Sequence, residues 1–345
     1  MYCCDADAVK RHRIILDIDN GLGLPVTDTD DGLALALALS SPEVELVGVT
    51  TCAGNTTTAR STRNTLVQLA LAGRREIPVA EGRAEPLLRS RTDHFAYLEA
   101  KSLGPGARFW SHLPPPPSPD HGASPLKAHE LIVREVRRHP GEVTVVAAGS
   151  LTNLALALLT DPDLAGLLKG VVHMGGGFEA VRKGDAPLVW ETPDIPPEVW
   201  RDTLRFNPLF DPEATAIVCL SGTPLTLVPV NVTACVFQRL EHLELLARNR
   251  SPFHRHLLRY ARPWVEWSRA HRKLPGAHLH DPLALALVVA PDLARYRRMW
   301  VDVARLLGLA DPWLRELPRG EVLRGSEVTV AVGVDAEGSE AWINT

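Results

Sequence analysis

Short apolar runs rich in Val, Ile and Leu recur along this chain and alternate with longer segments of helical periodicity. Such runs are typical of strands buried on both faces, and their alternation with helices is typical of a parallel sheet. The sequence therefore predicts an α/β fold with an open, mostly parallel, Rossmann-like sheet and helices on both faces. The expected strands are residues 13–18, 45–50, 142–147, 170–174, 214–220 and 225–230. The expected helices are residues 32–39, 57–72, 124–138, 153–159 and 282–289.

The composition gives no sign of a division into domains. The chain has 345 residues, of which 45% are hydrophobic and 23% charged. A chain of this kind can bury one large core, so we expect a single domain over residues 1–345. We expect residues 1–12 to form a flexible N-terminal extension and the Pro-rich residues 111–122 to form an extended surface loop.

Charge and cysteine content narrow the choice of partner and compartment. The 37 basic and 41 acidic residues nearly balance, so no strong field attracts nucleic acid or an anionic membrane. The five cysteines are sparse, odd in number and without metal-ligand spacing. The N-terminus lacks the apolar core of a signal peptide, and no apolar stretch is long enough to span a membrane. We expect a soluble, cytoplasmic protein that binds a small molecule, with no nucleic-acid or membrane partner.

Five aspartates crowd the segment RIILDIDNGLGLPVTDTDDGLAL, residues 13–35, behind the first expected strand. They are Asp17, Asp19, Asp28, Asp30 and Asp31. Ligands of open α/β sheets bind outside the carboxyl ends of the strands. Carboxylates packed together there repel one another unless a cation neutralises them. Hard oxygen ligands favour Ca²⁺, with Mg²⁺ as the second choice. Asp28 could instead only cap the helix that begins near Gly32.

Three further segments place polar residues at the ends of expected elements. In AAGSLTNLALAL, residues 147–158, a turn precedes a helix opened by Thr152, where a backbone carbonyl could face a metal. HLHDPLALALVV offers His280 and Asp281 as a proton donor and a metal ligand, although Asp281 could be a simple N-cap. In RFNPLFDPEATAIV, Asn207 could bind a polyol and Arg205 an anion, unless this segment is a solvated loop.

Seven segments in chain order carry a family resemblance. They are DID…DTDDGLALALAL, VTTCAGN, GSLTNLALAL, VVHMGGGF, RFNPLFDPEA, LVPVNVT and HDPLALAL. Together they resemble the inosine-uridine-preferring nucleoside hydrolase family from about Ile14 to Val289. The resemblance implies hydrolysis of an N-glycosidic bond, with a calcium ion at the bottom of the cleft that holds the attacking water and the ribose diol. It also implies a homodimer or homotetramer.

The resemblance assigns roles to individual residues. Asp19 matches the carboxylate that binds the ion and takes the proton of the water. Further metal ligands are implied at Asp31, at Asp281 and at the backbone carbonyl of Thr152.

Other matching positions concern the sugar and the leaving base. Ribose contacts are implied for Asp30, Asn55 and Asn207, and Met174 matches a residue that packs on the sugar. His280 matches the group that protonates the leaving base.

Departures from the family pattern concern the acidic loop, the 5′ position and the base. The residues NGLGLPVTDT separate Asp19 from Asp30, so Asp28 offers a competing register for the catalytic base. Arg205 replaces a common Glu at the ribose 5′-hydroxyl, which suits an anionic 5′ substituent such as phosphate. The family's base-binding flap is not recognisable, and its place is taken by a segment that offers His94.

Aromatic residues before His280 are further candidates for contact with the base. Trp264, Trp267 and His271 could stack on it or hydrogen-bond to it, or could belong to the core.

Two other functions fit parts of the sequence. A magnesium-dependent phosphohydrolase of the haloacid-dehalogenase type also begins with a strand ending in Asp-x-Asp, which here would make Asp17 the nucleophile. That interpretation leaves HDPLALAL unexplained and finds Asn20 after the second aspartate. A ribosyl-ligand-binding homologue without turnover would keep the same pocket and lose the chemistry through the altered loop or Arg205.

Overall fold

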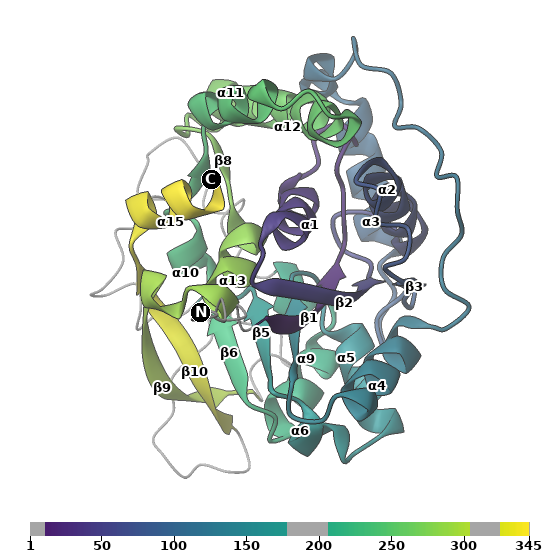
Figure 1. The fold of residues 1–345 in the computed structure, drawn as a ribbon, viewed down its shortest axis with the longest axis vertical. Helices are drawn as coiled ribbons and strands as arrows, with labels where there is room; N and C mark the ends of the chain where they lie inside the picture. Colours follow the sequence, from purple (N-terminus) through teal and green to yellow (C-terminus); the bar gives the residue numbers. More distant parts are fainter. Residues whose placement is uncertain (1–10, 178–205, 304–324, 345) are drawn as a thin grey trace, which may run out of the picture.

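An eight-stranded sheet runs through the centre of the computed structural model, which describes residues 11–177, 206–303 and 325–344 (Figure 1). The strand order is β3-β2-β1-β4-β5-β6-β10-β9. Neighbouring strands are parallel except β9 and β10, which are antiparallel at one edge. The bounds are β1 His12–Ile18, β2 Val44–Thr51, β3 Val79–Glu81, β4 Val143–Ala147, β5 Gly170–Met174, β6 Leu225–Val228, β9 Ala294–Asp302 and β10 Gly325–Val334. The predicted α/β fold is confirmed.

Helices cover both faces of this sheet. In chain order they are α1 Asp30–Ser40, α2 Thr58–Leu71, α3 Thr92–Leu103, η1 Pro105–Phe109, α4 Ala128–Arg138, α5 Thr152–Thr160, α6 Leu164–Leu167, α9 Pro212–Leu220, α10 Val230–Thr233, α11 Leu240–Arg248, α12 Pro252–His271, α13 His280–Val289, η3 Pro291–Leu293 and α15 Ala336–Ile343. A separate antiparallel pair joins β7 Phe237–Gln238 to β8 Ala277–His278. No described helix combines the length and the apolar character that crossing a membrane requires.

The two larger hydrophobic clusters of the core lie on opposite faces of the sheet, and a third, smaller cluster is centred on Tyr260 of α12. Side chains of a strand alternate between faces, and β1 shows this, because Ile14 and Leu16 join one hydrophobic cluster while Ile15 joins the other. Helices α1, α2 and α13 contribute to the first cluster, and α4, α5 and α9 to the second. In Figure 1 these two sets of helices lie on opposite sides of β1.

The strand expected at 214–220 is wrong, because these residues belong to helix α9. The composition ATAIVCL favours a strand, but the residues in front of it start a helix. The carboxylate of Asp211 accepts a hydrogen bond from the backbone N–H of Ala214 at 3.0 Å, and Pro212 occupies the first turn. Both features are typical of a helix N-terminus.

The sequence also predicted an N-terminal extension and a surface loop. Residues 1–10 of the expected N-terminal extension lie outside the described residues, and His12 already belongs to β1. Residues 111–122 contain neither helix nor strand and are mostly exposed.

The register of the parallel strands brings their carboxyl ends to one edge. Asp17 pairs with Thr50 of β2 and with Ala147 of β4, and Ala147 pairs with His173 of β5. The residues that follow these strands therefore converge, as ligand-binding residues do in open α/β sheets.

Candidate active site

Three carboxylates from two helices meet at this edge. Asp30 and Asp31 open α1, and Asp281 lies in the first turn of α13. The three side chains are buried, and one oxygen of each lies within 4.8 Å of the others. The backbone N–H of Asp281 donates to Oδ2 of Asp30 at 3.2 Å. Both helix N-termini thus support the negative charge with free N–H groups and with their dipoles.

Asp19 lies beside this cluster, immediately after β1, and is fully buried. Its backbone N–H donates to Oδ1 of Asp31 at 3.0 Å. Its carboxylate accepts hydrogen bonds from the backbone N–H of Asn55 at 2.7 Å and from Nδ2 of Asn55 at 3.2 Å. A Cβ at Gly54 would lie 1.8 Å from Oδ2 of Asp19, so only glycine permits this approach. The VTTCAGN segment therefore fixes the orientation of the Asp19 carboxylate.

The carboxylates carry more negative charge than their surroundings neutralise. Burial raises the pKa of Asp30, Asp31 and Asp281 well above the ordinary value, and neighbouring carboxylates raise it further. Burial also raises the pKa of Asp19, and the hydrogen bonds from Asn55 oppose this shift. Oδ2 of Asp31 is buried and has no hydrogen-bond partner. In the described part of the chain no Lys or Arg forms an ion pair with these groups, so the site suits a hard cation.

The long acidic loop between Asp19 and Asp30 is held by polar side chains of α2. Nδ2 of Asn20 donates to Oε1 of Gln68 at 2.6 Å, and Nε2 of Gln68 donates to the carbonyl of Gly32 at 3.0 Å. Nδ2 of Asn64 donates to the carbonyl of Asn20 at 3.0 Å. Helix α2 therefore holds the loop near both of its ends, at Asn20 after β1 and at Gly32 in α1. These bonds fix the distance between the end of β1 and the start of α1.

A pocket of about 630 Å³ opens beside the carboxylates. Most of the residues expected from the sequence line it, namely Asp28, Asp30, Asn55, Met174, Asn207, His280 and Asp281. Asp19, Asp31 and Thr152 are buried behind this lining. Arg205 lies outside the described residues.

Asn207 and His280 are each fixed by one or more hydrogen bonds. Nδ2 of Asn207 donates to the carbonyls of Ala148 at 2.6 Å and Met174 at 2.9 Å, which directs the amide oxygen elsewhere. Nδ1 of His280 bonds Oγ1 of Thr233 at 2.7 Å. Burial lowers the pKa of His280 to about 4, so the free imidazole is neutral near pH 7.

One wall of the pocket was not predicted from the sequence, except for its residue His94. Helix α3 lines the pocket through His94, Tyr97, Leu98 and Lys101, which share one helical face by their spacing. That spacing is the signal by which the sequence could have shown this wall. Nε2 of His94 bonds the carbonyl of Gly54 at 2.9 Å, next to Asn55.

Of the three aromatic residues of α12 that the sequence offered as contacts for the base, one lies at the pocket. Trp264 lines the pocket, whereas Trp267 and His271 do not. The rings of Trp264 and Trp267 stack at 4.8 Å, and Trp267 stacks on His271 at 5.5 Å.

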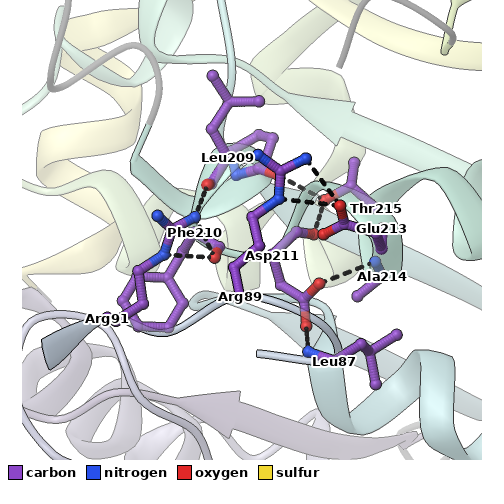
Figure 2. Close-up of polar contacts among 10 residues, drawn as sticks. Leu87, Arg89, Arg91, Leu209, Phe210, Asp211, Glu213, Ala214 and Thr215 are labelled. Atoms are coloured by element: carbon purple, nitrogen blue, oxygen red, sulfur yellow. Dashed lines mark hydrogen bonds and ion pairs between the residues drawn. The ribbon is translucent and has the colours of Figure 1, made fainter. Parts of the chain in front are cut away.

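Asp211 is a buried carboxylate that joins three separate segments near the pocket. Its Oδ2 accepts hydrogen bonds from Oγ1 of Thr152 at 2.7 Å and from the backbone N–H of Leu87 at 2.8 Å, while Oδ1 caps α9. Figure 2 shows the contacts of Asp211 with Leu87 and Ala214. One buried carboxylate thus ties α5, α9 and the segment before α3 together.

Two arginines strengthen the same junction. Arg91 donates to the carbonyls of Leu209 at 2.5 Å and Phe210 at 2.9 Å, and Arg89 pairs with Glu213 at 2.7 Å (Figure 2). Arg91 immediately precedes α3, so these bonds fix where the pocket-lining helix begins.

The fold and the site together define an α/β protein with an acidic pocket suited to a hard cation and a hydroxyl-rich ligand. The model of the inosine-uridine preferring nucleoside hydrolase family matches residues 14–341. A probable uridine nucleosidase 1 of Oryza sativa subsp. japonica is 32% identical over 86% of this chain and 82% of its own length. A pyrimidine-specific ribonucleoside hydrolase RihA of Citrobacter koseri is 32% identical over 77% of this chain and 78% of its own length.

A solved plant nucleoside hydrolase superposes with a TM-score of 0.73 at 27% identity, covering 96% of this chain and 98% of that one. The chain belongs to the inosine-uridine preferring nucleoside hydrolase family. It is an N-glycosidase that hydrolyses the bond between sugar and base.

Replacing Asp211 by Ala should cost about 3 kcal/mol or more of unfolding free energy. Loss of a cap costs about 1 kcal/mol, and each buried donor left without an acceptor costs about 1–3 kcal/mol. The control is Asp335→Ala, which removes an exposed cap on Gly338 and should cost about 1 kcal/mol. Urea unfolding measures both, and equal losses would contradict the bracing role of Asp211.

Replacing Asp31 by Asn should make stability respond differently to pH and to cations. In chelator near pH 7 the variant should match or exceed the parent, because it has one buried negative charge fewer. The raised pKa of Asp31 means that the parent loses stability as pH rises above the ordinary aspartate range, so the difference should vanish in acid. Thermal unfolding across pH measures this.

Saturating Ca²⁺ or Mg²⁺ should reverse the order of the two proteins. At about 100 times its Kd a cation stabilises the parent by about 3 kcal/mol, and Asp31→Asn should gain much less. Asp17→Asn is the control. Asp17 is also a buried aspartate with a raised pKa of about 6, but its carboxylate accepts hydrogen bonds from Thr50 and Asn153 and is not part of the cluster. An equal gain in Asp31→Asn and the parent would place the cation elsewhere.

Proposed function

We propose that the chain hydrolyses ribonucleosides in a calcium-dependent reaction that releases ribose and the free base. This proposal rests on the cluster of buried carboxylates beside a pocket lined by amides and histidines. Relatives named uridine nucleosidase and pyrimidine-specific ribonucleoside hydrolase support a nucleoside substrate.

The proposed metal ligands are Asp19, Asp31, Asp281 and the backbone carbonyl of Thr152. All are hard oxygen donors, which favours Ca²⁺ over softer metals and fits the unpaired Oδ2 of Asp31. A bound Ca²⁺ would neutralise the carboxylates and lower the pKa of an attacking water. Asp30 belongs to the same group of carboxylates, so its proposed ribose contact would lie beside a bound ion.

Asp19 is proposed as the general base. Burial raises its pKa, which makes its carboxylate a stronger acceptor for the proton of water. Its two hydrogen bonds from Asn55 hold it in one orientation, so no reorientation precedes the transfer.

The ribose is proposed to lie between Asp30, Asn55 and Asn207, with Met174 packed on the sugar. The amide oxygen of Asn207 can accept from a hydroxyl because its N–H groups are already used. Cleavage builds an oxocarbenium-like cation on the sugar, which nearby carboxylates stabilise more than they stabilise the substrate. Direct attack by water inverts the configuration at the anomeric carbon. His280 is proposed to assist the departure of the base.

Two properties remain proposals from the sequence. Arg205 is proposed to accept an anionic 5′ substituent, and the assembly is proposed to be a homodimer or homotetramer. Sedimentation velocity measures the assembly.

A panel of nucleosides and their 5′-monophosphates should show release of ribose that chelator abolishes and excess Ca²⁺ restores. Reducing-sugar assay and chromatography of the free base measure it. Faster turnover of the monophosphates would support the role of Arg205, and preference for the nucleosides would remove it. Tight binding of every ribosyl ligand without release of base would instead favour a binding protein.

Asp19→Asn and Asp28→Asn should separate the two candidate bases. We expect Asp19→Asn to lower kcat by about 10²–10⁴, the usual contribution of a general base. Asp28→Asn should retain far more activity. Steady-state kinetics at saturating Ca²⁺ measure both, and the reverse order would assign the base to Asp28.

A further inference from the structure

Two cationic side chains line the pocket and have no role in the proposed chemistry so far. Lys101 comes from α3, and Arg272 follows the last residue of α12. Among the described residues neither side chain forms a hydrogen bond or an ion pair. The opposite charge that acts on both is the carboxylate of Asp28, which also lines the pocket.

Arg272 is held in place by aromatic rings. Its guanidinium carbon lies 4.9 Å from the ring centre of Trp264 and 4.9 Å from that of Trp267. These rings stack on each other with an angle of 9° between their planes. Cation–π attraction therefore fixes the guanidinium without using its N–H donors, which remain for a ligand.

Lys101 brings a second positive charge close to Arg272. Burial and the charge of Arg272 lower the pKa of Lys101 to about 8, so the ammonium still predominates near pH 7. The charge of Asp28 offsets part of the repulsion between these two cations, and an anionic ligand would offset more of it. Neither group can accept a hydrogen bond, so this wall suits an electron-rich or anionic group.

Arg272 lines the pocket near His278 and His280, and Lys101 lies close enough to Arg272 for their charges to interact. The charge of Arg272 acts on His278 and His280, whereas the largest charge effects on Asp31 and Asp281 come from other carboxylates. If water attacks from the carboxylate side, the base leaves on the opposite side of the sugar. The leaving base then faces Lys101 and Arg272.

We propose that Lys101 and Arg272 are catalytic residues that stabilise the negative charge on the departing base. This proposal rests on the proposed function. The bond between C1′ and the base nitrogen breaks, and its electron pair stays on the base, spread over ring nitrogens and carbonyl oxygens. The water oxygen bonds to C1′ and its proton passes to Asp19. The base anion then takes a proton that comes from solvent and is relayed by His280, the residue proposed to assist the departure.

Substrates that differ in their leaving group separate this role from a structural one. Uridine has a poor leaving group, whereas 4-nitrophenyl riboside releases a stable phenolate that needs little help. Arg272→Met and Lys101→Met should each lower kcat for uridine by about 10²-fold, as loss of one preorganised charge-stabilising donor does. The loss for the nitrophenyl riboside should be less than about fivefold. Arg272→Lys and Lys101→Arg should recover most of the uridine activity.

Arg269→Met is the matched control, because Arg269 is an exposed residue in the last turn of α12, just before Arg272, and does not line this pocket. It should leave kcat for both substrates unchanged. Equal losses on both substrates in Arg272→Met, or no loss on either, would overturn the proposal. A preference of the parent for uridine 5′-monophosphate that disappears in Arg272→Met would also overturn it, in favour of a phosphate subsite.

Binding of free bases tests the subsite without turnover. 5-Nitrouracil is an anion at neutral pH and uracil is neutral, so calorimetry should show tighter binding of 5-nitrouracil to the parent and loss of that preference in Arg272→Met. Equal binding of the two bases by the parent contradicts the proposal. If no riboside is hydrolysed, the proposed function fails, and this measurement still decides whether the cations bind an anionic base.

Discussion

Repulsion between buried carboxylates is the constraint on which this structure depends. Asp30, Asp31 and Asp281 share a space small enough for one ion, and burial strengthens every charge interaction among them. Two helix N-termini relieve part of this cost and leave an oxygen of Asp31 unpaired, while the bonds from Asn55 stabilise the neighbouring carboxylate of Asp19. Buried carboxylates that repel one another lower the stability of the fold. Such a cluster is therefore expected at a functional site, where a protein loses stability in exchange for activity.

The scaffold around the cluster holds these repelling groups together. Gln68 and Asn64 anchor the long loop on one side, and Asp211 joins α5, α9 and the approach to α3 on the other. Each of these polar side chains is buried and hydrogen-bonded. A change in its position would leave buried hydrogen-bonding groups without a partner, which costs free energy. The carboxylates therefore cannot relax apart without breaking contacts in the surrounding elements.

The sequence predicted the parallel core and the residues nearest the metal-competent cluster, since both depend on local signals. The apolar runs at β1, β4 and β5 are covered on both faces, and the aspartates follow a strand directly. The strand expected at 214–220 failed because its composition outweighed the helix start at Asp211 and Pro212. Strand β9, ARYRRMWVD, went unrecognised because exposed charged residues interrupt its pattern at the sheet edge. Lys101 and Arg272 come from distant segments, and only tertiary packing brings their charges together.

The two ends of the pocket carry opposite charge, and this polarity matches the chemistry of glycosidic cleavage. As the bond to the base lengthens, positive charge grows on the sugar and negative charge grows on the base. Carboxylates at one end and cations at the other stabilise both developing charges at once, and they do so more strongly in the transition state than in the neutral substrate. Asp28 lines the same pocket, and its charge acts both on Asp30 and on Arg272.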